Sequence, residues 1–140
     1  MTRVEFYFNV EDKLAQVTEL CGKAVAKGRQ LTVFTPNDCI SEQLRKQLWG
    51  GVSTSFLPSM LPQEHGAHMS PIILDAYGEN LLQDDILINM QHQHPPFFSR
   101  FRYLVELVGN EETDKVAARA RFKFYRDRGY QIKSTDVRAK

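Results

Sequence analysis

The sequence predicts an α/β fold built on a mainly parallel β-sheet. Strand and helix patterns alternate through the first half of the chain in the order β-α-β-α. A β-α-β unit implies a parallel pair of strands joined by a right-handed crossover. Three further strand patterns and one more helix follow. The 140 residues contain no internal repeat, low-complexity tract or interdomain linker, so we expect a single domain over residues 1–140.

The first strand is expected at residues 3–10, where aromatic and β-branched side chains dominate. Asp12 is a candidate N-cap for the helix that follows, because a short side-chain oxygen accepts a hydrogen bond from the first helical turn. Apolar residues at helical spacing continue as far as Gly28, which is expected to end the helix as a C′ glycine.

The second strand is expected at residues 31–34, and the turn at residues 36–38 leads into a second helix. Ile40, Leu44 and Leu48 would place the apolar side of that helix on the sheet. After Trp49 the periodicity weakens, so residues 50–70 are interpreted as a long connection with a short extended piece at residues 55–58.

The second half of the chain contains three strand patterns, one long helix and a short closing strand. The expected strands are residues 71–76, 85–90, 103–108 and 130–133, and the expected helix spans residues 112–128, ahead of Gly129. Residues 134–140 are expected to form a loose tail.

Charge is distributed very unevenly along the chain. Residues 115–140 contain nine Lys/Arg and only Asp127 and Asp136 as acids, about +7, whereas residues 1–114 carry about −6. The formal net charge of +1 therefore hides a basic C-terminal segment. Such a segment is suited to an anionic partner: nucleic acid, phosphate or an acidic peptide.

Composition places the chain among globular proteins of the cytosol. No run of 18 apolar residues is present, so no transmembrane helix and no membrane partner are expected. The N-terminus carries acids where a signal peptide needs an apolar stretch. Cys21 and Cys39 lack CxxC spacing and are interpreted as reduced, buried, small apolar residues.

The sequence lacks the motifs of nucleotide and metal binding. No GxGxxG follows the first strand and no GxxxxGK[ST] occurs, so we expect no nucleotide and no other cofactor. His92 and His94 form an HxH pair, and His65 and His68 lie in the long connection. With no cysteine nearby in sequence and no HExxH motif, they are interpreted as surface residues and not as metal ligands.

The carboxylates also offer no active site. Asp84 and Asp85 would point to opposite faces of a strand and could not readily share a proton. Glu111, Glu112 and Asp114 stand at the start of the last helix, where acids favour the helix dipole. We therefore expect no catalytic residues and no enzymatic activity of the chain itself.

The last helix is the strongest candidate for a binding surface. At about 100° per residue, Val116, Ala117, Ala120 and Phe124 would form its core stripe. The opposite ridge collects four cations with Phe122 along its edge; they are Lys115, Arg119, Lys123 and Arg126. Arg121 and Arg128 would lie on the other flank. Composition alone leaves open an acidic peptide, a nucleic acid or a merely solvated face.

A second candidate surface follows the second helix. Trp49 is the sole tryptophan, and it precedes an apolar loop that includes Phe56, Leu57 and Pro58. Because loops are normally polar, an apolar loop indicates either burial or a partner surface. We expect Trp49 and Phe56 to be partly exposed and to form one apolar patch.

These pieces, in their order and spacing, resemble the χ (chi) subunit family of bacterial DNA polymerase III holoenzyme over about 130 residues. The segments that carry the resemblance are Phe6-Tyr7-Phe8, Lys27-Gly28-Arg29, Leu44-x-x-x-Leu48-Trp49, Ser55-Phe56-Leu57-Pro58, Ser70-Pro71-Ile72-Ile73-Leu74, Asp85-Ile86-Leu87-Ile88 and Ala118-Arg119-x-Arg121-Phe122-Lys123-x-Tyr125-Arg126 with Gly129.

The resemblance implies a three-layer α/β/α domain with a mixed, mostly parallel sheet, Rossmann-like but without a phosphate-binding loop. It further implies a non-catalytic subunit of a DNA-directed DNA polymerase assembly. Such a subunit bridges the clamp-loader complex, through the ψ (psi) subunit, to the acidic C-terminal tail of single-stranded DNA-binding protein, and meets DNA indirectly.

The resemblance also assigns residues to these two contacts. The tail-binding positions correspond to Lys115, Arg119, Phe122, Lys123 and Val108, and the ψ-binding positions to Trp49, Phe56, Leu57 and Pro58. Phe122 stands where the family's best-known pattern has Tyr, so the ring is kept and one hydroxyl is lost. The rival hypotheses are a direct nucleic-acid-binding protein that uses the same basic helix and a degenerate nucleotide hydrolase.

Overall fold

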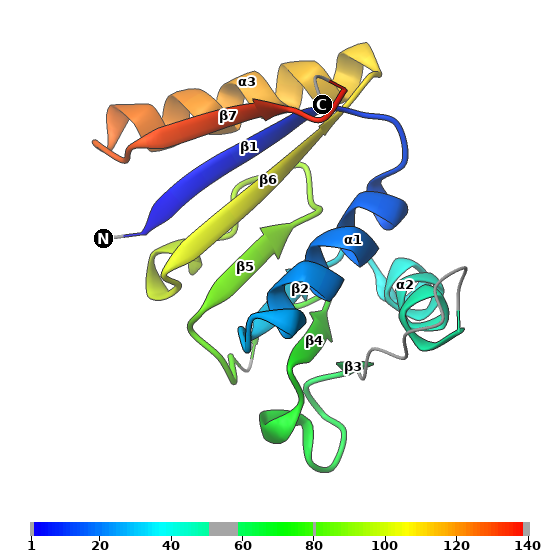
Figure 1. Ribbon diagram of the computed structural model, residues 1–140. Helices are drawn as coiled ribbons and strands as arrows, with labels where there is room; N and C mark the ends of the chain where they lie inside the picture. The colour runs from blue at the N-terminus through cyan, green and yellow to red at the C-terminus, as the bar shows by residue number, and fades with distance from the viewer. Residues whose placement is uncertain (1, 51–58, 80, 139–140) are drawn as a thin grey trace.

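The computed structural model describes residues 2–50, 59–79 and 81–138. Its elements in chain order are β1 (Arg3–Val10), α1 (Lys13–Ala26), β2 (Leu31–Phe34), α2 (Asp38–Gly50), β3 (Ser59–Met60), η1 (Ala67–Met69), β4 (Ile72–Asp75), β5 (Ile86–Asn89), η2 (Phe98–Arg100), β6 (Tyr103–Gly109), α3 (Glu112–Asp127) and β7 (Ile132–Asp136). The predicted α/β class is confirmed (Figure 1).

The strands form one sheet in the order β3-β4-β2-β5-β6-β1-β7, and every pairing between described strands is parallel. β1 and β2 run parallel as predicted, but they do not pair with each other. They belong to the same sheet, but β5 and β6 lie between them, and β1 pairs with β6 and β7. A local β-α-β pattern does not specify which later strand enters the sheet between its two strands.

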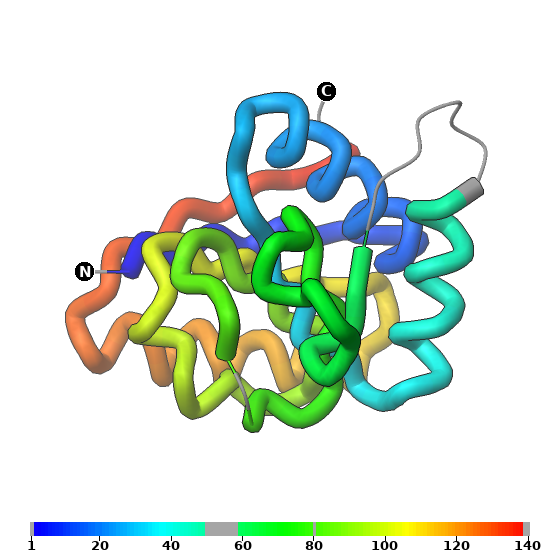
Figure 2. The backbone as a smooth tube through the Cα atoms, turned by 90° about the horizontal axis from the view of Figure 1, so that it is seen from below, coloured from blue at the N-terminus to red at the C-terminus, as the bar shows by residue number. Residues whose placement is uncertain are grey.

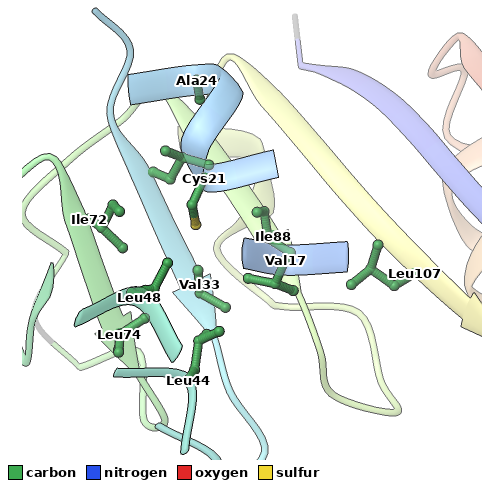
Figure 3. Close-up of a cluster of buried hydrophobic side chains, with 11 residues drawn as sticks. Val17, Cys21, Ala24, Val33, Leu44, Leu48, Ile72, Leu74, Ile88 and Leu107 are labelled. Atoms are coloured by element: carbon green, nitrogen blue, oxygen red, sulfur yellow. The ribbon is translucent and has the colours of Figure 1, made fainter. Parts of the chain in front are cut away.

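Helices cover both faces of the sheet, which gives three layers (Figures 1 and 2). On one face, Val17 and Cys21 of α1 and Leu44 of α2 pack over Val33 and the neighbouring strands (Figure 3). On the other face, buried residues of α3 pack over β1 and β6, in a second cluster that includes Phe6, Leu104, Ala118 and Tyr125. Burial of these two apolar clusters is the main force that fixes the layers.

The local rules predicted the first helix well. Asp12 is its N-cap and accepts a hydrogen bond from the Ala15 N–H at 3.2 Å. Gly28 follows the helix with φ of 73°, a left-handed conformation that glycine adopts without steric cost.

The predicted core stripe of the last helix was wrong in phase. The buried residues of α3 are Ala118, Arg121 and Tyr125, whereas Val116 is 55% exposed. The prediction placed apolar side chains inward and the arginine on a flank. Arg121 is buried because Glu106, its acidic partner on β6, lies beneath it. The face of α3 that contacts the sheet is therefore the one that carries Arg121, and not the predicted apolar stripe.

The end of the chain is more ordered than expected. β7 continues through Asp136, so Ser134, Thr135 and Asp136 pair with β1 instead of belonging to a loose tail. The Thr135 hydroxyl donates to the Glu5 carboxylate at 3.1 Å, which ties the two strands together.

Two smaller expectations are also tested. Cys21 is buried as expected, but Cys39 is exposed on the first turn of α2; both are free thiols. Within the described residues, no helix is both long and apolar enough to cross a membrane.

Candidate partner-binding site

A pocket of about 260 Å³ opens where α3 lies over the ends of β1 and β6 and beside β7. Its lining comes from residues distant in sequence: Phe6, Phe8, Asn9, Val108, Gly109, Lys115, Ala118, Arg119, Phe122 and Ser134. Four of the five predicted tail-binding residues, Val108, Lys115, Arg119 and Phe122, are therefore brought together.

The floor of this pocket is apolar and its rim is cationic. The rings of Phe6 and Phe122 pack at 5.4 Å between centroids, tilted by 58°, and Val108 is buried beside them. Arg119 projects from the rim with 69% of its side chain exposed, and its only ion pair within the described chain is with exposed Glu112 at 3.7 Å. A contact this exposed is weak, so the guanidinium can exchange it for a ligand carboxylate.

Lys123 lies outside the pocket lining. It is exposed on α3, one helical turn beyond Arg119. Lys123 is exposed, as expected for the cationic side of the helix. A ligand that fills the pocket would contact Lys123 only by extending along α3.

Sequence reasoning missed the contribution of β1 and β7 to the site. Phe6 and Phe8 were recognised as strand residues, but nothing in their local pattern indicates that α3 covers them. Asn9 has φ of 63°, at an irregularity in the β1–β6 pairing between Tyr7 and Val10. Asparagine tolerates this left-handed conformation better than most residues, so the residue type was the one available signal.

The N-terminal end of α3 is fixed to the sheet by Asp114. Its carboxylate accepts hydrogen bonds from the Gly109 N–H and from Lys13 Nζ, the latter at 3.0 Å. Burial alone would raise the pKa of Asp114, but the Gly109 N–H and the Lys13 ammonium outweigh it and hold that pKa below its usual value. The acid predicted to favour the helix dipole thus also anchors α3 beside the pocket.

The middle of α3 is fixed by a buried polar network around Glu106 of β6. Arg121 Nε donates to Glu106 at 2.9 Å, Asn89 Nδ2 donates to both carboxylate oxygens at 3.1 Å, and the Tyr125 hydroxyl also donates. Arg121 also donates to the His92 carbonyl at 2.7 Å.

Burial raises the pKa of Glu106, against the lowering effect of these donors. Because Arg121, Asn89 and Tyr125 all donate to it, Glu106 is the acceptor and carries the charge that pairs with Arg121. On α3 the pocket residues, from Lys115 to Phe122, lie between Asp114, which is bound to Gly109 and Lys13, and Tyr125, which is bound to Glu106.

The histidines behave differently from one another. His94 is half-buried and stacks on Phe124 with 3.6 Å between ring centroids. Burial, together with the nearby Arg128 charge, lowers its pKa. His65, His68 and His92 are exposed. Across the part of the chain that the structure describes, no three His, Cys, Asp or Glu side chains gather in a way that could hold a metal ion.

The second candidate surface is described only in part. Trp49, near the end of α2, is 66% exposed, as predicted. Phe56, Leu57 and Pro58 lie outside the described residues. Of the four predicted patch residues, the structure therefore describes Trp49 alone. Its helix, α2, packs against the sheet face opposite α3.

Acrylamide should quench the fluorescence of Trp49 efficiently in the isolated protein, because the indole is largely exposed. A Stern–Volmer titration against free N-acetyltryptophanamide measures this. The single tryptophan makes the signal unambiguous. Quenching as weak as that of a core tryptophan would contradict the partner-surface interpretation.

Comparison with known proteins places the chain in a family. The family model described as "DNA polymerase III chi subunit, HolC" matches residues 1–133. The chain is 30% identical to the DNA polymerase III subunit chi of Pseudomonas aeruginosa over 136 residues, covering 94% of each chain. It is 26% identical to the subunit chi of Haemophilus influenzae, covering 95% of this chain and 96% of the relative. The subunit chi of Escherichia coli is 26% identical over 83% of this chain and 80% of its own.

Proposed function

The chain belongs to the DNA polymerase III chi subunit family, whose members are accessory subunits of the polymerase. From that premise we propose that it acts as a non-catalytic adaptor. One surface binds the acidic C-terminal tail of single-stranded DNA-binding protein. The other binds ψ and thereby the clamp-loader complex. The adaptor links the replicative polymerase to coated template and performs no chemistry of its own.

The observation that carries the proposal is the pairing of an apolar pocket with cations at its rim. A peptide that ends in an aromatic residue can place its ring against the apolar floor that Phe6 and Phe122 form in the pocket, because aromatic rings pack favourably on one another. Lys115 and Arg119 then stand where the terminal and side-chain carboxylates of that peptide would lie.

Phe122 supplies the ring that the family's usual tyrosine would supply, without the hydroxyl. Few contacts are made by so short a ligand, so micromolar affinity is expected. Several tails presented together on coated DNA would raise the effective affinity through avidity. Acidic residues further along the tail would approach Lys123, which lies one turn beyond Arg119 on the exposed side of α3.

Calorimetric titration with an acidic peptide ending in Asp-Phe tests the proposal. Micromolar binding supports it. Two control peptides sharpen the result: one with a C-terminal amide and one with the last Phe replaced by Ala. Both should bind at least tenfold more weakly, since one loses a charge-assisted contact and the other loses the buried ring. Equal binding of all three peptides would contradict the pocket assignment.

Arg119→Ala should weaken binding of the tail peptide by about 1.5–3 kcal/mol, because a charge-assisted hydrogen bond is lost. The melting temperature should stay within a few degrees, since the side chain is exposed. Arg126→Ala is the matched control: this exposed cation is on the same helix and outside the pocket. Unchanged peptide affinity for Arg119→Ala would refute the role of Arg119.

A direct nucleic-acid interaction of α3 is the second candidate function. It is favoured by the exposure of Arg119, Lys123 and Arg126 along one side of the helix. A nucleic acid that contacts several of these cations should show a steep dependence of affinity on salt, whereas a short tail should show a shallower one. The slope of log Kd against log salt therefore separates the two.

A further inference from the structure

The face of β1 opposite the pocket carries a second set of side chains. Successive residues of a strand point to opposite sides of the sheet. Phe6 and Phe8 face α3, and Glu5 and Tyr7 therefore emerge on the side of α1. On that side α1 lies across the middle of the sheet, and no helix of the described chain covers β1 and β7 (Figure 1).

Two hollows on this open face join into one groove. One, of about 540 Å³, lies over β1, β6 and β7. The other, of about 230 Å³, lies between α1 and the strands beside it. Because Glu5, Tyr103 and Val105 line both hollows, the groove runs from α1 across the sheet to its β7 edge.

Cations lie along the whole groove. Those that line it are Arg3, Lys23, Lys27, Arg29 and Lys133. Glu5 is the one acid in the described lining, and Lys133 lies 3.8 Å from it. Lys23 pairs with Glu19, and Arg29 with Asp85, just outside the groove.

Arg3 and Lys27 form no ion pair with any described residue. The five cations of the groove outnumber three acids, which are Glu5 in the lining and the ion-pair partners Glu19 and Asp85. The groove therefore carries an excess of positive charge. This excess is notable in a chain whose residues 1–114 carry about −6 overall.

Planar groups accompany these charges. The guanidinium of Arg29 lies 4.8 Å from the centre of the Tyr103 ring, so an arginine and an aromatic ring already stack at the floor of the groove. Tyr7 and Val105 extend the flat, partly exposed strand surface next to them. Aromatic rings and arginine planes on an open sheet are surfaces on which nucleic-acid bases stack.

We infer that this groove binds single-stranded nucleic acid. The repeating phosphates would meet cations spaced from α1 to β7, and one or two bases would stack on Tyr103 and its neighbours. An acidic peptide accounts for the groove less well. It would use the cations, but it would not use the planar surface of Arg29 and Tyr103. The groove and the tail pocket occupy opposite faces of the sheet, so both ligands can be held at once, and the inference does not depend on tail binding.

The test is a fluorescence-anisotropy titration of labelled oligothymidylate, about 15 nucleotides long, at low salt. Arg3→Glu combined with Lys27→Glu should weaken binding at least tenfold and flatten the salt dependence. The neutral pair Arg3→Gln and Lys27→Gln should give a smaller loss, and it covers the case in which the reversed charges impair folding. The control Lys46→Glu reverses an exposed charge on α2 outside both hollows and should change affinity less than twofold, whereas Arg126→Glu tests the alternative nucleic-acid surface on α3.

Tyr103 provides a second arm. Tyr103→Phe keeps the ring and should bind as the parent does, whereas Tyr103→Leu should bind about fivefold or more weakly, since stacking of a base on an aromatic ring is lost. Saturating tail peptide should leave the oligonucleotide affinity unchanged. No anisotropy change at low salt, a greater loss for Arg126→Glu than for the groove variants, or competition by the tail peptide would each overturn the inference.

Discussion

Glu106→Gln should lower the free energy of unfolding by about 3–5 kcal/mol, the cost typical of breaking a buried ion pair on one side. The carboxylate is fully buried and accepts from Arg121, Asn89 and Tyr125. The amide has the same shape but no charge, and its NH₂ group would face donors. Arg121, with 4% of its side chain exposed, would then hold an uncompensated charge in the interior.

Chemical denaturation followed by far-ultraviolet circular dichroism measures the effect. Removing both charges with Glu106→Leu and Arg121→Leu should restore part of the lost stability, because no uncompensated charge remains, although the Asn89 and Tyr125 donors lose their acceptor. Glu112→Gln is the matched control: it breaks the exposed pair with Arg119 and should cost less than about 0.5 kcal/mol. A loss below 1 kcal/mol for Glu106→Gln would mean that the network contributes little.

The same network explains where sequence-based prediction of the fold succeeded and failed. Most strands and the helices were recognised because their apolar periodicity, Asp12 and Gly28 are local signals, whereas the two-residue strand β3 falls in the segment that was interpreted as a connection. The face that α3 buries was mispredicted because Arg121 is a poor core residue on any hydrophobicity scale. Glu106, 15 residues earlier on β6, and the His92 carbonyl accept its hydrogen bonds and make its burial favourable, and these contacts are a property of the tertiary structure.

The candidate site was predictable to a similar extent. Lys115, Arg119 and Phe122 share one helix, so helical geometry could place them together. Phe6, Asn9 and Ser134 join them only because β1 lies between β6 and β7 in the sheet. No local pattern encodes that strand order. The resemblance to a known family assigned Val108 to the site, which residue chemistry alone would have left in the core.

The two proposed partner surfaces should respond independently to mutation. Trp49→Ala should weaken ψ binding by about 2–4 kcal/mol, the range of an interface hot spot centred on a large aromatic side chain. The Trp49 helix and α3 pack on opposite faces of the sheet, and the tail pocket shares no lining residue with α2. Distant sites without shared partners couple by less than about 0.5 kcal/mol, so tail affinity should be preserved.

Arg119→Ala should show the reverse pattern, with weakened tail binding and unchanged affinity for ψ. Calorimetry of each variant with ψ and with the tail peptide measures both effects. Lys46→Ala, an exposed substitution on the same helix as Trp49, is the control for nonspecific changes in α2. An adaptor must hold both partners at once, so a pull-down with immobilised ψ should retain the tail peptide in the presence of the parent protein. Mutual exclusion of ψ and the peptide would indicate one shared surface, and the bridging function would then be wrong.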